Sequence, residues 1–85
     1  MAEAGRLVLT LYSRAWCHLC EEMLAGLQEL QARRPFELEV VDIDTRPALE
    51  LRFGEIVPVL MHGERELCHY RLDAATVTDY LLNFR

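Results

Sequence analysis

The chain of 85 residues is poor in glycine and proline, has no lysine, and has no long hydrophobic run. Four Gly and three Pro are too few for collagen-like or low-complexity sequence. No stretch comes near the ~18 uncharged apolar residues that a membrane span requires. The first five residues lack the basic region and long apolar core of a signal peptide. We therefore expect a cytoplasmic protein with no membrane segment.

Positive charge is also scarce. Nine arginines stand against 14 acidic residues, which gives a formal net charge of −5. Nucleic acids and anionic membranes require a basic surface, so we expect neither as a partner. Hydrophobic residues make up 52% of the chain and charged residues 27%, which is typical of a globular protein. A chain of this length has room for one core, so we predict a single domain over residues 1–85 and a monomer.

Only three cysteines are present, and an odd number in a short chain does not suit a disulfide framework. Two of them form Cys17-His18-Leu19-Cys20, whereas Cys68 stands alone. A C-x-x-C near a strand–helix–strand pattern is typical of a redox-active dithiol. Two alternatives stay open: the pair are core cysteines at helical spacing, or they bind zinc together with Cys68 and His69 or His18.

Hydrophobic periodicity predicts alternating strands and helices. The apolar run from Leu7 to Leu11 predicts a strand buried on both faces, followed by a loop at 12–16. A helix is predicted from Cys17 to about Arg33, because one apolar stripe recurs at spacings of 4, 4 and 3 residues. The stripe comprises Leu19, Met23, Leu27 and Leu30.

The rest of the chain reads as a strand at 36–43, a short helix, a hairpin of strands at 57–61 and 66–68, and a last helix. Asp44-Thr45-Arg46-Pro47 predicts the capped start of the short helix, which ends at Gly54 in the C′ position. Asp73 is the predicted cap of the last helix. We expect a four-stranded mixed sheet with the 6–11 strand at its centre, parallel to 38–42 and antiparallel to 58–61.

This order of elements, with a C-x-x-C at the first helix, resembles the thioredoxin-like fold in its minimal glutaredoxin form, over Arg6 to Phe84. The segment Tyr12-Ser13-Arg14-Ala15-Trp16-Cys17-His18-Leu19-Cys20 is similar to the glutaredoxin active-site segment. The resemblance implies an α/β protein with the order βαβ-α-ββα that acts as a thiol–disulfide oxidoreductase. Cys17 would be the nucleophile, because a helix start favours the thiolate, and Cys20 would be the resolving thiol.

The resemblance also implies a substrate site. Val57-Pro58 resembles the segment whose cis proline faces the active site, so we expect a cis bond and a Val57 backbone that pairs with the substrate. Arg14 matches a lysine that contacts the glutathione carboxylate, and Asp73 corresponds to an aspartate that binds the γ-glutamyl end. For Trp16, beside the reactive cysteine, two roles stay open: part of a docking surface for the substrate, or a packing residue of the loop.

Two departures from the family patterns bear on the electron donor. Leu11 stands where thioredoxins carry a buried aspartate, which favours a glutaredoxin. Tyr70-Arg71-Leu72-Asp73 replaces a glycine-rich glutathione-binding segment and looks more like that of redoxins reduced by thioredoxin reductase.

We expect a disulfide-containing protein as substrate, no bound cofactor, and glutathione or thioredoxin reductase as electron donor, with weak glutathione binding. The alternative is a non-catalytic module that binds a partner or carries a metal or iron–sulfur cluster.

Overall fold

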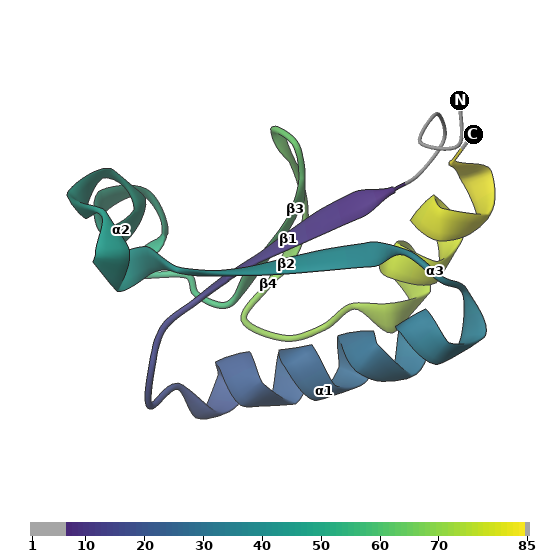
Figure 1. The fold of residues 1–85 in the computed structure, drawn as a ribbon, viewed down its shortest axis with the longest axis horizontal. Coiled ribbons are helices and arrows are strands. Elements are labelled where there is room, and N and C mark those ends of the chain that lie inside the picture. Colours follow the sequence, from purple (N-terminus) through teal and green to yellow (C-terminus); the bar gives the residue numbers. More distant parts are fainter. Residues whose placement is uncertain (1–6, 85) are drawn as a thin grey trace.

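Four strands form one mixed sheet in the computed structural model, which describes residues 7–84 (Figure 1). Their order in the sheet is β2-β1-β3-β4. Strand β1 pairs with β2 in parallel and with β3 in antiparallel orientation, which confirms the predicted arrangement. The strands are β1 (Val8–Ser13), β2 (Glu37–Asp42), β3 (Val59–His62) and β4 (Arg65–His69).

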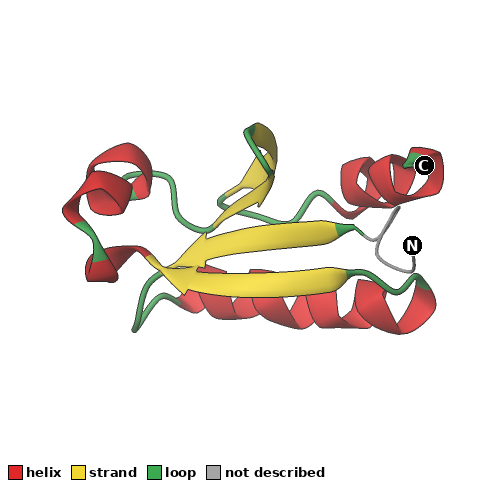
Figure 2. Cartoon of the chain, turned by 45° about the horizontal axis from the view of Figure 1, so that its top comes forward, coloured by secondary structure: helices red, strands yellow, loops and turns green. Residues whose placement is uncertain are grey.

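Three α-helices accompany the sheet: α1 (His18–Arg33), α2 (Pro47–Phe53) and α3 (Ala74–Asn83). Helix α1 runs under the sheet, and its N-terminus lies at the same end as α2 (Figure 1). Helix α3 lies at the opposite end, which Figure 2 shows from a second direction. Within residues 7–84, no helix is both long and apolar enough to cross a membrane.

The larger core fills the space between the sheet and helices α1 and α3. The predicted stripe of α1 faces it: Met23 is 1% exposed and Leu27 is fully buried. Each such side chain contributes roughly 1.5–3 kcal/mol by leaving water. The other buried members are Leu7, Leu9, Leu11, Phe36, Leu60 and Val77. This core fixes α1 against the sheet, and therefore fixes the position of the helix start.

A smaller core lies on the other face, under α2. It comprises Ile43, Phe53, Val59 and Met61, and the Tyr12 ring stacks on Phe53 with centroids 4.4 Å apart. Helix α2 has only seven residues and packs on one part of this face. Val8, at the start of β1, is therefore 36% exposed, and the prediction that this strand is buried on both faces was wrong there.

The carboxyl end of β1 differs from the sequence prediction because this strand pairs with a distant segment. Tyr12 and Ser13, expected in a loop, extend β1 because they pair with Val41 and Asp42 of β2. Arg6, the predicted first residue of this strand, lies outside the described residues.

The start and end of α2 also differ from the prediction. Asp44 lies in a 3-10 turn (Ile43–Thr45), and Arg46 is the N-cap of α2 without a side-chain capping bond. Gly54 ends the helix with right-handed backbone angles (φ −57°), so it is not a left-handed C′ glycine. A Cβ at this position would lie 2.5 Å from the Glu50 carbonyl oxygen, so the close approach of the backbone requires glycine there.

Candidate active site

Cys17 is the N-cap residue of α1. Its backbone is extended (φ −109°, ψ 106°), and its Sγ accepts the backbone N–H of Cys20 at 3.2 Å. The two sulfurs are bonded as a disulfide, with the Cα atoms 5.2 Å apart. This separation lies inside the range of about 4.4–6.8 Å that disulfides adopt. The structure therefore holds the oxidised form of the predicted dithiol.

The two cysteines differ in exposure. Cys20 is 4% exposed and lies on the buried side of α1 with Met23, whereas Cys17 is only partly buried. An incoming molecule therefore reaches Cys17 before Cys20.

Trp16, directly before the disulfide, is 99% exposed. Its backbone is left-handed (φ 61°), a region that residues other than glycine seldom adopt. Such outliers are concentrated at functional sites, where the surrounding structure enforces them. The arrangement holds a large aromatic surface in solvent beside Cys17.

The Val57-Pro58 peptide bond is cis, as predicted. Pro58 is buried, and the next residue, Val59, pairs with Tyr12 near the carboxyl end of β1. The chain runs from there to Cys17 in five residues, so the Val57-Pro58 segment and the disulfide lie at the same end of the sheet. No residue between 7 and 84 hydrogen-bonds to the Val57 backbone, which leaves its N–H and C=O able to pair with another chain.

Arg14 is bound to the protein's own carboxylates. Its guanidinium donates to Asp44 and to Glu50, each at 2.9 Å, and to the Gly54 carbonyl at 3.4 Å. The bonds to Asp44 and then Glu50 raise the pKa of Arg14 above its usual range. Arg14 thus ties the loop before Cys17 to the 3-10 turn and α2. Its contact with glutathione stays a prediction.

Asp73 is the N-cap of α3, which confirms its predicted place at the helix start. Its carboxylate accepts the backbone N–H of Thr76 at 3.1 Å and the Thr76 hydroxyl at 2.8 Å. These bonds, the backbone one first, lower the pKa of Asp73. A role of Asp73 in ligand binding stays a prediction.

Tyr70 has a structural role that sequence reasoning missed. Its backbone N–H donates to the Pro58 carbonyl at 2.9 Å, and its hydroxyl donates to the Glu55 carbonyl at 2.8 Å. No local pattern signals these bonds, because the partners lie 12 and 15 positions earlier in the chain. Tyr70 also lines a cleft of about 280 Å³ against α1, together with Leu19, Glu22, Met23, Arg71 and Leu72.

A short chain of polar contacts crosses the surface beside this cleft. His18, next to Cys17, lies 2.9 Å from the Glu22 carboxylate, and Arg71 lies 3.8 Å from the same residue. Glu22 thus links the first turn of α1 to the segment before α3.

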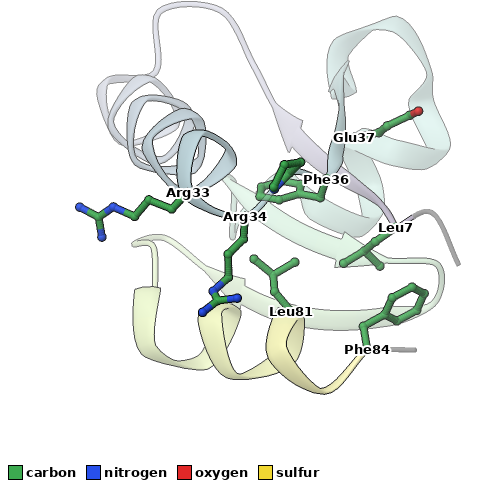
Figure 3. A pocket seen from close by; sticks show the side chains of 8 residues that line it. Leu7, Arg33, Arg34, Phe36, Glu37, Leu81 and Phe84 are labelled. Atoms are coloured by element: carbon green, nitrogen blue, oxygen red, sulfur yellow. The ribbon is translucent and has the colours of Figure 1, made fainter.

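A larger cavity, of about 590 Å³, lies at the far end of the molecule (Figure 3). It opens where α1 ends and where the last turn of α3 approaches β2. Its lining comprises Leu7, Arg33, Arg34, Pro35, Phe36, Glu37, Leu81 and Phe84. None of these side chains is a thiol or an imidazole, so this cavity lacks the groups on which the redox hypothesis depends.

The zinc alternative receives no support from the described part of the chain. No group of three or more His, Cys, Asp or Glu side chains between residues 7 and 84 is placed to hold a metal ion. Cys68 lies in β4 opposite Leu60, where it packs against the larger core and is not bonded to another cysteine. Burial is the main cause that raises the pKa of the Cys68 thiol.

Fold and site together define an α/β protein with a thioredoxin-like fold and a Cys-x-x-Cys pair at the start of its first helix. The chain belongs to the glutaredoxin-like domain family (DUF836), whose sequence profile matches residues 8–82.

Two solved structures and one curated relative are similar to this chain. The solution structure of protein Ne2328 from Nitrosomonas europaea is 44% identical, with a TM-score of 0.78, and the match covers 88% of this chain and 91% of that one. Protein XcR50 from X. campestris is 39% identical, with a TM-score of 0.69, over 86% and 93% of the two chains. An uncharacterized protein of Mycobacterium tuberculosis is 29% identical over an alignment of 68 residues, and the match covers 74% of this chain and 70% of that one.

A thioredoxin from Fasciola hepatica shares the fold. The TM-score is 0.62 at 16% identity, over 95% of this chain and 83% of that one. The fold and the Cys17–Cys20 pair fit a thiol redox function.

Proposed function

We propose that the protein is a thiol–disulfide oxidoreductase that reduces protein disulfides or glutathione mixed disulfides through Cys17 and Cys20. One observation carries the proposal: a bonded cysteine pair at the N-terminus of α1, with its more exposed sulfur on the cap. In the reduced protein, the Cys20 backbone N–H and the helix dipole stabilise a thiolate at Cys17. A thiolate is the form that attacks disulfides.

The reaction proceeds in two exchange steps. The Cys17 thiolate attacks one sulfur of the substrate disulfide, an S–S bond forms between them, and the other substrate sulfur leaves as a thiolate and takes up a proton. Cys20 then loses its proton and attacks the Cys17 sulfur, which releases the second substrate thiol and restores the disulfide seen in the structure. Two electrons pass from the protein to the substrate. A dithiol, or two molecules of a monothiol, must reduce the protein again.

The substrate would dock between three parts of the site. The Val57 backbone, which has no hydrogen-bond partner within residues 7–84 and is held by the cis bond to Pro58, offers a peptide edge. Trp16 offers an exposed aromatic surface beside Cys17. Arg14 and Asp73 would contact a glutathione moiety. The Arg14 guanidinium would then bind glutathione in addition to Asp44 and Glu50, which it contacts in the structure.

We further propose a monomer in the cytoplasm, with glutathione or thioredoxin reductase as electron donor and no bound cofactor. An odd cysteine count and a reducible C-x-x-C suit a compartment that keeps thiols reduced.

A coupled NADPH assay tests the function and identifies the donor. Insulin is the disulfide substrate, and NADPH oxidation is followed with glutathione plus glutathione reductase in one series and thioredoxin reductase in another. We expect turnover in one series and none with the Cys17→Ser variant. If neither donor supports turnover, and the chemically reduced protein fails to reduce insulin, the oxidoreductase proposal is wrong.

A further inference from the structure

Tyr70 adopts a backbone conformation that its residue type disfavours. Its φ is 65°, and within residues 7–84 only Trp16 and Tyr70 have positive φ among residues other than glycine. A bulky side chain in this region is a genuine outlier, which persists only where surrounding contacts impose it. Tyr70 lies at the site end of β4, one residue beyond His69.

The contacts that impose this conformation hold one segment at two points. The Tyr70 N–H binds the Pro58 carbonyl, which extends the pairing of β3 with β4 by one residue. The phenol hydroxyl binds the Glu55 carbonyl. Tyr70 therefore bridges from Pro58, through its backbone, to Glu55, through its side chain. Tyr70 is 46% exposed, so it lies at the surface of the site.

Val57 lies between the two points that Tyr70 holds. Its own backbone N–H and C=O have no hydrogen-bond partner among residues 7–84, so their direction depends on the cis bond to Pro58 and on the bonds that hold the flanking residues. An edge that must pair with an incoming extended chain is effective only when its donors and acceptors already point outward. The Ile56 N–H bonds to the Phe53 carbonyl, and the two bonds of Tyr70 tie the segment to β4. Removal of the Tyr70 hydroxyl would leave one of these two ties.

We propose that Tyr70 is a positioning residue for polypeptide substrates: it fixes the segment Glu55–Pro58, so that the Val57 backbone pairs with an extended chain carrying the cysteine that Cys17 attacks. The inference rests on the proposed function and names its substrate class, a disulfide whose cysteine lies in an extended peptide. A small disulfide without a peptide backbone does not use this edge.

The test compares two substrates with Tyr70→Phe, which keeps the ring and removes the hydroxyl. With a disulfide-bonded peptide we expect KM to rise roughly fivefold while kcat stays within twofold, as for the loss of one net hydrogen bond. With 5,5′-dithiobis(2-nitrobenzoate), which has no peptide backbone, the rate should be unchanged. Tyr70→Asn should raise KM for the peptide similarly, because Asn tolerates the left-handed region but cannot reach Glu55.

Tyr80→Phe is the matched control. It removes a hydroxyl that bonds to His62 and leaves Tyr70 and the segment Glu55–Pro58 unchanged, so KM for the peptide should not change. Equal changes on both substrates, or an unchanged KM with both Tyr70 variants, would overturn the inference while the oxidoreductase function stands. A wild-type protein that reduces neither substrate would overturn the function itself and the inference with it.

Discussion

Helices α1 and α3 start with the same capping geometry, made by different atoms. At α1, the Cys17 sulfur accepts the N–H of Cys20 at 3.2 Å. At α3, the Asp73 carboxylate accepts the N–H of Thr76, also three residues on, at 3.1 Å. The Thr76 N–H, and after it the Thr76 hydroxyl, lowers the pKa of Asp73, so these donors at the helix start favour the anion.

The two helix starts differ in whether the capping residue stabilises the helix or the helix stabilises the capping residue. A carboxylate is a strong acceptor and a favoured cap, so Asp73 stabilises α3. Sulfur is a weak acceptor, so Cys17 contributes little to α1, whereas the helix stabilises a thiolate on Cys17. The start of α3 thus serves stability, and the start of α1 serves chemistry.

The largest expected effect comes from Cys17→Ser. Serine is a better cap than cysteine, but it is no thiolate nucleophile, so turnover should fall below detection while the reduced protein keeps or gains thermal stability. Insulin reduction measures the loss of turnover. The melting temperature of the same samples, under reducing conditions, measures the thermal stability. Retained turnover would show that Cys17 is not the nucleophile.

Cys20→Ser should separate attack from resolution. Cys17 still attacks, but no internal thiol expels the product, so a mixed disulfide with the substrate should accumulate. Reduction of protein disulfides should fall strongly, while activity on a glutathione mixed disulfide survives, because free glutathione resolves that adduct. Intact-mass spectrometry detects the trapped adduct; an adduct at Cys68 instead would contradict the assignment.

Asp73→Ala should lower the melting temperature by several degrees, because α3 loses both its cap and a charge at its positive end. The folded state lowers the pKa of Asp73, so its charge contributes stability above the unfolded carboxyl pKa of about 3.9, and this contribution is lost as pH falls through the lower folded value. The difference from wild type should therefore be largest near neutral pH and shrink in acid. Thermal unfolding from pH 2 to 7 measures it, and a difference independent of pH would rule out the charge contribution.

The smallest effect is expected at Cys68, which lies at no helix start. Its thiol pKa is raised, chiefly by burial, so little thiolate exists at neutral pH and iodoacetamide should label Cys17 well before Cys68. Cys68→Ala should leave turnover unchanged and cost about 1 kcal/mol of stability, a typical value for a single substitution. Peptide mapping after brief alkylation gives the order, and faster labelling of Cys68 would contradict it.

Sequence reasoning succeeded where local pattern and burial coincide. The apolar stripe of α1 was predictable because one face of the sheet buries it. The pairing of Cys17 with Cys20 was predictable because both thiols lie within one helical turn. The start of α2 was not predictable, because Asp44, the expected cap, lies in the 3-10 turn and binds Arg14 of a distant loop, and α2 begins after Arg46 without a side-chain cap. The Tyr70 bonds to Pro58 and Glu55 could not be predicted from the sequence either, because they form only when β3 pairs with β4.

Trp16 gives the molecule a spectroscopic reporter of its own state. It is the single tryptophan in the sequence, it is 99% exposed, and it precedes the Cys17–Cys20 disulfide directly. A disulfide accepts an electron from an excited indole and quenches its emission at short range, whereas a dithiol does so much less. Reduction of the Cys17–Cys20 disulfide should therefore increase the intrinsic fluorescence of Trp16. The midpoint potential of the cysteine pair can then be measured by a fluorescence titration of the unlabelled protein.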